Sequence, residues 1–259
     1  MNKIGNEQLL QKALQIIQEG SRRGILVRLL GGLAIYCHCP HSRESFFART
    51  YGDIDLFGLS SQRRIINEVM EDLGYKPCKE FNAIHGERRL MYYDEHSDVR
   101  VDYLLDFFEM CHKIDLRNRL EEDEITIPLA DLLLTKLQVV ELTEKDIKDI
   151  IVLLIDHELG NSDEADKINA KYIAKLCSDD WGLYKTVNMT LDKVVEWVNQ
   201  SILDMEDKED ILSKINRLRA IIDAEPKSLK WKMRAKIGEK VRWYELPEEP
   251  LHKDFPIQQ

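Results

Sequence analysis

Asp53 and Asp55 are the residues whose type and spacing point most directly to chemistry. They stand two positions apart in 51–57 (YGDIDLF), and residues two apart on a strand project from the same face. Ile54 and Leu56 would then pack on the opposite face. Two carboxylates held this close repel each other and raise each other's pKa unless a cation lies between them. Because Mg²⁺ binds through one or two carboxylates together with substrate phosphates, the pair predicts a site for Mg²⁺, or for Mn²⁺ in its place.

A glycine pair upstream would provide room for those phosphates. Gly31 and Gly32 follow the apolar run 25–30 and precede a short apolar stretch at 33–36, which we expect to be helical. Glycine lets the backbone approach a phosphate closely, and a helix N-terminus attracts anions. The glycine pair and the two carboxylates together predict a metal–triphosphate site.

Composition limits the classes of protein to consider. The 259 residues suffice for one large domain or two modest ones. The net charge of −10 argues against nonspecific binding to long nucleic acids, although it leaves room for a local basic site. Five cysteines do not resemble a disulfide framework. The chain has neither an apolar run of membrane-span length nor an N-terminal signal-peptide pattern, so we expect a cytoplasmic protein with no membrane partner.

The first half of the chain is predicted to be a mixed α/β unit. Apolar residues at helical spacing predict a helix over 6–19, and Ser60 or Ser61 would cap a second helix that ends at Gly74. Residues 38–50 are expected to form a loop. Apolar runs and period-two alternation predict strands at 25–30, 51–57 and 99–105, with further extended segments at 75–81 and 83–93.

Beyond Pro128 the pattern is almost entirely helical, and the stretch 143–146 resembles a capping box. The predicted helices cover 129–140, 144–159, 163–177, 180–199 and 207–224. We therefore expect an α/β domain over 1–127, a helical domain over 128–225 and a basic, aromatic extension over 226–259. The end of that extension, 245–259, contains three prolines and would run over the surface.

The glycine pair, the sequence Asp53-Ile54-Asp55 and the later Asp102 resemble the nucleotidyltransferase superfamily with the DNA polymerase beta-like fold. The resemblance implies an α+β fold, with a mixed sheet and flanking helices followed by a mainly helical C-terminal domain. It also implies that Asp53, Asp55 and Asp102 hold two divalent ions. Asp98 and Asp106 are rivals of Asp102 for the third position.

The stretch GGLA…RT…DIDL is similar within that superfamily to the AbiEii and MenT toxin group. The resemblance implies further functional residues on later helices, namely Lys136 and the pair Lys145-Asp146. Over most of the chain, stretches such as MCHKIDLRNRL and WKMRAKIGEKVRWYELPEE look like an uncharacterised family of predicted nucleotidyltransferases. The gap between Gly32 and Asp53 is longer than the usual superfamily spacing, which makes the segment 37–49 an insertion.

The resemblance implies a role for each of these residues. Asp53 and Asp55 would hold the ion that bridges the triphosphate, and Asp102 would complete a second metal site and activate an acceptor hydroxyl. Gly31 and Gly32 would cradle the β- and γ-phosphates. The remaining candidates are Arg49 as a phosphate contact, Lys136 as the neutralising charge, and Lys145 and Asp146 for acceptor positioning.

Structural alternatives stand beside these roles. Lys136 would otherwise extend to solvent from an apolar helix. Lys145 and Asp149 have the spacing of an ordinary pair on a helix surface, and Asp146 occupies the capping-box position.

The expected reaction is Mg²⁺-dependent transfer of a nucleoside monophosphate from an NTP to an acceptor, with release of pyrophosphate. A small molecule, the 3′ end of a tRNA and a protein hydroxyl are all candidate acceptors. The alternatives are a catalytically silent protein on the same fold that binds an NTP or a partner, and the toxin of a toxin–antitoxin pair.

Two further motifs lie outside this scheme. The cluster Cys37-His38-Cys39-Pro40-His41, with Cys111-His112, suggests zinc, but its spacing matches no established zinc pattern, and a loop with buried thiols is the simpler interpretation. The basic stretch 227–244 suggests contact with tRNA through its aromatic residues. Alternatively, Trp231 and Trp243 anchor this stretch to the helical domain.

Overall fold

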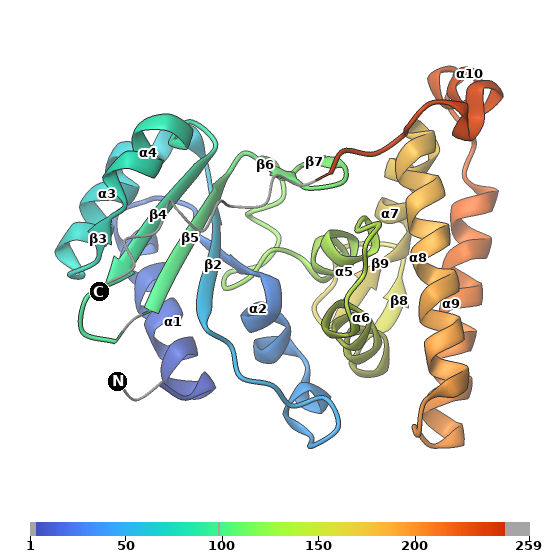
Figure 1. Ribbon diagram of the computed structural model, residues 1–259, viewed down its shortest axis with the longest axis horizontal. Helices are drawn as coiled ribbons and strands as arrows, with labels where there is room; N and C mark the ends of the chain where they lie inside the picture. The colour runs from blue at the N-terminus through green and yellow to red at the C-terminus, as the bar shows by residue number, and fades with distance from the viewer. Residues whose placement is uncertain (1–3, 98, 247–259) are drawn as a thin grey trace.

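The computed structural model describes residues 4–97 and 99–246, and a five-stranded mixed sheet forms its N-terminal half (Figure 1). The strand order is β1 (Arg28–Leu30), β2 (Asp53–Gly58), β5 (Val99–Leu105), β4 (Arg89–Asp94) and β3 (Lys76–Pro77). The β2–β5 pair is parallel, whereas the other neighbouring strands are antiparallel. The two central strands therefore run side by side in the same direction.

Helices α1 (Asn6–Arg22) and α3 (Arg63–Asp72) pack against each other beside the sheet. The alternation in β5 explains which face they cover, since Val101 and Tyr103 are buried whereas Asp102 is only partly buried. The period-two pattern thus assigns the apolar residues of the strand to the core and Asp102 to the opposite face.

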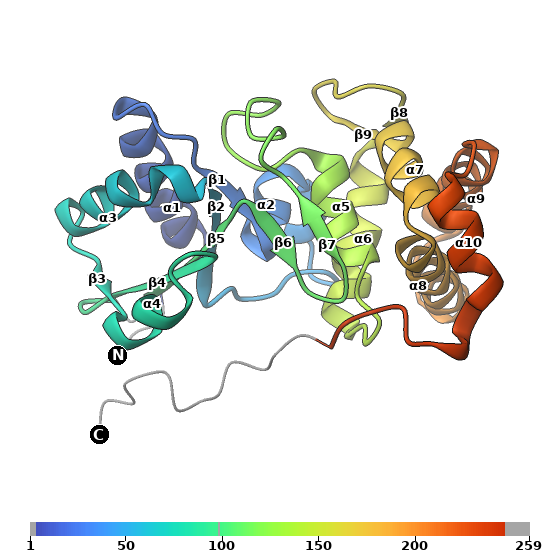
Figure 2. The same ribbon diagram turned by 90° about the horizontal axis from the view of Figure 1, so that it is seen from above.

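The C-terminal half is mainly helical. Its helices are α5 (Leu129–Leu137), α6 (Glu144–Asp156), α7 (Ala170–Asp179), α8 (Trp181–Gln200), α9 (Met205–Ala224) and α10 (Leu229–Ile237). In Figures 1 and 2, α5 and α6 lie between the sheet and the long hairpin of α8 and α9. Helix α2 (Gly31–His38), which begins directly after β1, packs against both α5 and α6. The α+β class and the mainly helical C-terminal region are confirmed.

Two connections join the halves. The segment before α5 returns to the sheet edge, where the Leu29 N–H donates to the Ile125 carbonyl (2.8 Å) and the Ile127 N–H donates to the Leu29 carbonyl (3.0 Å). Arg119 then donates to the fully buried Asp131 of α5 (2.9 Å) and to Asp163 (2.7 Å). The division at 127, 225 and 259 stays a prediction.

The segment predicted to be extended over 75–81 and 83–93 contains a helix instead. α4 (Lys79–His85) lies between β3 and β4, so the prediction is confirmed for these two strands and wrong for the residues of α4. The Asn82 side chain accepts from the Met91 N–H (2.7 Å) and donates to the Met91 carbonyl (3.1 Å), and Phe81 is buried. A tertiary contact with β4, which local propensity does not encode, stabilises the helix.

Three smaller predictions also need correction. The helix predicted over 163–177 begins at Ala170, because β9 (Lys167–Asn169) pairs with β8 (Glu158–Gly160) immediately before it. Neither Ser60 nor Ser61 caps α3: both lie in a 3₁₀ turn, η2 (Ser60–Gln62). The expected loop at 38–50 contains another such turn, η1 (Pro40–Arg43), and β6 (Phe107–Glu109) and β7 (Lys113–Asp115) add a small hairpin.

Two further observations concern membrane-spanning helices and the residues that the structure does not describe. Across 4–97 and 99–246, no helix combines the length and the apolar character that a membrane crossing requires. Asp98 and most of the predicted proline-containing tail, residues 247–259, lie outside the described residues.

Candidate metal and nucleotide site

The three predicted carboxylates lie on one face of the central strand pair. In the parallel β2–β5 pair, Asp55 is the register partner of Asp102, and Asp53 is the partner of Arg100. Because register partners on neighbouring strands share a face, Asp53, Asp55 and Asp102 project from the same side of the sheet. Ile54 and Leu56 are fully buried on the other side, as the spacing requires.

Asp55 carries the clearest electrostatic signature of the three. Its pKa is raised to about 7, first by burial and then by the neighbouring carboxylates of Asp53 and Asp102. Lys136 and Arg89 act in the opposite direction, but they do not cancel the effect. Burial is the main cause of this shift and the neighbouring carboxylates add to it, so a cation bound among the three would favour the charged form of Asp55.

Gly31 brings bare backbone against this carboxylate. It adopts a left-handed conformation with φ of +70°, and a Cβ built on it would lie 2.3 Å from Asp55 Oδ2. A Cβ on Gly32 would lie 2.6 Å from Arg49 Nη2. Only glycine fits at either position without displacing a neighbour, so the pair sets the spacing between α2, Asp55 and Arg49.

Arg49 lies beside the site but is held by another residue. Its Nη2 donates to both Asp149 carboxylate oxygens at 2.7 Å, and its guanidinium lies 4.9 Å from the centre of the Tyr51 ring. Burial is the largest single influence and disfavours the charged form, but Asp149 and Tyr51 together outweigh it and raise the pKa of Arg49. Arg49 therefore remains a cation next to Gly32.

Lys136 does not extend to solvent, so that alternative is wrong. Its side chain is only 16% exposed, and Nζ lies 3.0 Å from Asp146 Oδ1 and 2.9 Å from Asp149 Oδ2. Burial lowers its pKa, but these two carboxylates outweigh burial and raise the pKa overall. The Lys136 charge also reaches the carboxylate face, because it is one of the groups that lower the pKa of Asp55.

Asp149 is a residue that the sequence reasoning missed. The predicted helix-surface pair between Lys145 and Asp149 is wrong, since Asp149 is 3% exposed and binds Arg49 and Lys136 instead. The spacing of Asp149 from the apolar residues Ile150 and Leu153 was the only signal of an inward position. Asp146 forms the predicted capping box, in which the Asp146 N–H donates to Thr143 Oγ1 (3.3 Å), and it also pairs with Lys136.

Arg89 is the second residue that the sequence reasoning missed. It approaches Asp102 from β4 and donates through Nε to Oδ1 (2.8 Å) and Oδ2 (3.0 Å), and through Nη2 to Oδ2. The rival Asp106 faces elsewhere, accepting from the Ser60 N–H (3.0 Å) and hydroxyl (2.6 Å). Among the described candidates, Asp102 is therefore the one that shares a face with Asp55.

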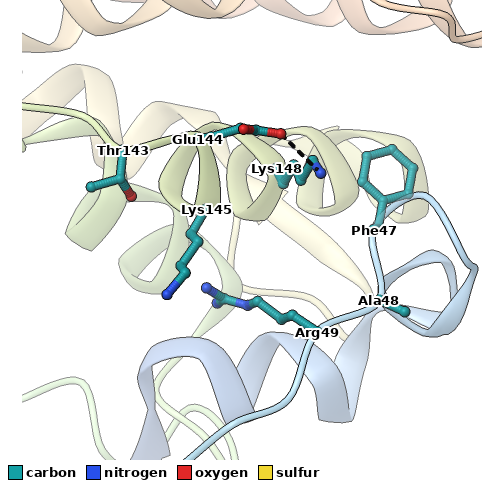
Figure 3. Close-up of a pocket in the computed structure, with 7 residues that line it drawn as sticks. All are labelled: Phe47, Ala48, Arg49, Thr143, Glu144, Lys145 and Lys148. Carbon is teal, nitrogen blue, oxygen red and sulfur yellow. Dashed lines mark ion pairs between the residues drawn. The ribbon is translucent and has the colours of Figure 1, made fainter.

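A cavity of about 420 Å³ opens next to Arg49. Its walls come from the segment before β2 and the first turns of α6, namely Phe47, Ala48, Arg49, Thr143, Glu144, Lys145 and Lys148. In Figure 3 the Lys145 ammonium and the Arg49 guanidinium extend toward each other, whereas Lys148 pairs with Glu144 (3.0 Å). The structure thus brings Arg49 and Lys145 together at one basic cavity of the size that small ligands occupy.

The Cys37–His41 cluster does not converge on a single point. Cys39 Sγ lies 3.7 Å from His157 Nε2, His38 Nε2 lies 2.8 Å from Thr126 Oγ1, and His41 Nδ1 lies 2.5 Å from Asp156 Oδ1. Within 4–97 and 99–246, no three His, Cys, Asp or Glu side chains are arranged to hold one metal ion by themselves, and this includes both the cluster and the set Asp53, Asp55 and Asp102. His38, Cys39 and His41, like the carboxylate of Asp102, have protein partners instead.

The aromatic residues of the basic C-terminal stretch pack onto the helical half. Trp231 makes an edge contact with Tyr184, and Trp243 Nε1 donates to Thr186 Oγ1 (3.1 Å). These contacts favour the anchoring interpretation over stacking on nucleic-acid bases.

No protein family model matches the chain, and no curated protein matches it. Among solved structures, the lincomycin-bound lincosamide antibiotic adenylyltransferase LnuA aligns at 19% identity over 55% of this chain and 94% of its own, with a TM-score of 0.40. The antibiotic-resistance factor ANT(2'')-Ia aligns at 14% identity over 57% of this chain and 83% of its own, with a TM-score of 0.38. An antigenic nucleotidyltransferase-like protein from Paracoccidioides brasiliensis aligns at 12% identity over 88% of this chain and 97% of its own, with a TM-score of 0.41. Each TM-score lies below 0.5, so we argue the function from the residues of the site alone.

Proposed function

We propose that the protein is a nucleotidyltransferase that moves a nucleoside monophosphate from an NTP to an acceptor hydroxyl and releases pyrophosphate. The observation that supports this most directly is the alignment of Asp53, Asp55 and Asp102 on one sheet face, with the Gly31 backbone against Asp55. This arrangement places carboxylates beside the first residue of α2, and a helix N-terminus is a site that can bind phosphate.

The residues present fit a divalent ion of the magnesium type. Mg²⁺ prefers oxygen ligands and needs only one or two carboxylates when substrate phosphates complete its shell. Asp53 and Asp55 supply two carboxylates from one strand, and a bound cation would offset the repulsion from Asp53 and Asp102 that contributes to the raised pKa of Asp55. When bound, the ion would neutralise triphosphate charge and polarise the α-phosphate.

Cationic residues beside the carboxylates suit the triphosphate. Gly31 and Gly32 expose backbone at the start of α2, where N–H groups point toward an anion. Arg49 lies against Gly32, and the charge of Lys136 acts on the same carboxylate face. These groups would bind the phosphates and stabilise the charge that develops on the leaving pyrophosphate.

Asp102 is the candidate general base. The acceptor hydroxyl would give its proton to this carboxylate as its oxygen forms a bond to the α-phosphorus and the bond to the bridging oxygen of pyrophosphate breaks. The cavity beside Arg49 and Lys145 offers a place for part of the nucleotide or of the acceptor. A small molecule, a tRNA 3′ end and a protein hydroxyl remain the acceptors to test, and a toxin role remains a prediction from the resemblance.

Calorimetric titration with each NTP, with and without Mg²⁺, tests the proposal. Wild-type protein should bind at least one NTP in a Mg²⁺-dependent manner, and Asp53→Asn/Asp55→Asn should lose that binding. The matched control Glu206→Gln/Glu209→Gln removes two exposed charges from the outer helix α9 and should bind as wild type does. Absence of Mg²⁺-dependent binding and of α-phosphate label transfer in wild type, with every NTP and all three acceptor classes, would contradict the proposal.

A further inference from the structure

Arg89 forms an ion pair with Asp102, the third carboxylate of the site. Its guanidinium contacts both oxygens of Asp102 from the neighbouring strand, with Nε 2.8 Å from Oδ1 and 3.0 Å from Oδ2. Hydrogen bonding to Asp102 is the main cause that raises the pKa of Arg89, and the charge of Asp55 contributes. Arg89 therefore responds to the same carboxylate face that the divalent ion would occupy.

The sheet register explains why Arg89 reaches this point. In the antiparallel β4–β5 pair, Met91 is the partner of Asp102 and Arg89 is the partner of Leu104. Arg89, two residues before Met91, shares the face of Asp102 and crosses diagonally to it. The contact is thus determined by strand pairing.

We propose that Arg89 is a built-in counter-cation that holds Asp102 away from divalent ions until nucleotide phosphates draw it off, so that Arg89 controls the number of ions the site binds. This inference rests on the proposed function. Without nucleotide, Asp53 and Asp55 bind the first ion, and the Arg89–Asp102 contact opposes a second. With nucleotide, Arg89 moves from a carboxylate to phosphate oxygens and frees Asp102.

The charges at the site explain the position of Arg89 both without and with nucleotide. Lys136 pairs with Asp146 and Asp149. Among the described residues, Arg89 is the cation that forms an ion pair with one of the three carboxylates Asp53, Asp55 and Asp102. A guanidinium binds phosphate in the same two-pronged way as it binds a carboxylate, so a triphosphate offers Arg89 an equivalent partner.

The surroundings allow such an exchange. The Arg89 side chain is 34% exposed, whereas that of Asp102 is 15% exposed, so the cation is the more accessible member of the pair. Its guanidinium carbon lies 5.8 Å from the centre of the Phe81 ring, which flanks it from α4. Arg89 can therefore turn toward a ligand while β5 keeps Asp102 in register with Asp55.

Counting bound Mn²⁺ by electron paramagnetic resonance tests the inference. Wild type should bind one Mn²⁺ without nucleotide and two with a non-hydrolysable NTP analogue. Arg89→Gln should bind the second Mn²⁺ without nucleotide at least tenfold more tightly than wild type, and adding Asp102→Asn should remove this gain. Arg89→Lys, which keeps the charge but loses the two-pronged contact, should give a smaller gain.

Arg88 provides a matched control. It precedes Arg89, is 76% exposed and pairs with Glu109 at the surface (3.3 Å), so Arg88→Gln makes the same charge change away from the carboxylates and should leave Mn²⁺ binding unchanged. An Arg89 that serves only as a structural salt bridge would give unchanged ion numbers and affinities in folded Arg89→Gln and Arg89→Lys, which would overturn the inference. Wild type that binds no Mn²⁺ with or without nucleotide would instead contradict the proposed function itself.

Discussion

At the scale of single residues, the site is defined by how its charges are compensated. Asp102 pairs with Arg89, and Asp149 pairs with Arg49 and Lys136. Within 4–97 and 99–246, Asp55 forms no such ion pair, and burial together with Asp53 and Asp102 raises its pKa to about 7. After burial, repulsion by the Asp53 and Asp102 carboxylates is thus the second cause that disfavours the charged form of Asp55, the residue that lies against Gly31.

This raised pKa predicts a pH dependence of stability. Between the ordinary aspartate pKa near 4 and about 7, the folded protein retains a proton on Asp55 that the unfolded chain has released. The folded state therefore binds more protons in this range, and the free energy of unfolding should fall as pH rises through it, by roughly 2–3 kcal/mol between pH 5 and 7. Urea denaturation of wild type and Asp55→Asn across this range measures the contribution.

Asp55→Asn carries no titrating group at this position, so its stability should lack that decline and should exceed that of wild type at pH 8. Saturating Mg²⁺ with NTP should restore wild-type stability at pH 8 and leave Asp55→Asn unaffected. A difference between the two proteins that does not change with pH would contradict the assignment.

At the scale of elements, the junction of β1 and α2 positions the backbone that we propose binds phosphate. The turn works only because Gly31 adopts a positive φ and carries no side chain toward Asp55. Gly52, directly before β2, has open space around its Cβ position and no positive φ. The two glycines therefore differ in function although both flank the site.

Gly31→Ala should both destabilise the protein and abolish NTP binding. The left-handed conformation costs about 1–2 kcal/mol for a residue with a Cβ, and displacement of the Asp55 carboxylate adds to this. Gly52→Ala should change stability by less than about 1 kcal/mol and keep binding intact. Thermal denaturation combined with NTP titration measures both effects, and a stable Gly31→Ala that binds NTP normally would show that the turn is not needed.

At the scale of the whole molecule, the sheet half and the helical half share one continuous hydrophobic core. Arg119 contributes a polar tie between them, because it binds the buried Asp131 of α5 and Asp163, and its guanidinium carbon lies 4.0 Å from the centre of the Tyr172 ring. Burial raises the pKa of Asp131 to about 6 even with Arg119 present. Arg119 thereby anchors the segment that leads from the sheet half into α5 to Asp131, Asp163 and Tyr172 of the helical half.

Arg119→Met should lower the free energy of unfolding by about 3–5 kcal/mol, because it leaves the buried carboxylate of Asp131 without its cationic partner. Arg117→Met, two residues earlier, removes a half-exposed partner of Asp115 and should cost less than about 1 kcal/mol. Chemical denaturation of the two variants provides the comparison. Equal losses of unfolding free energy in the two variants would mean that the burial of Asp131 does not make its ion pair with Arg119 more important for stability.

Features that depend on neighbours along the chain follow from the amino-acid sequence without knowledge of the fold. The spacing of Asp53 and Asp55 places them on one strand face through backbone geometry alone. Thr143 and Asp146 form their capping box within one turn. The α+β class and most helices follow from apolar periodicity, which is also local.

Only the tertiary structure decided which distant side chains meet. The network of Arg49, Asp149 and Lys136 joins segments up to 100 residues apart, and no local pattern specifies such a meeting. The contact of Arg89 with Asp102 depends on strand register, and α4 depends on the Asn82 contact with β4. Sequence spacing fixes which way a side chain projects from its own element, but packing of the elements decides which charge it faces.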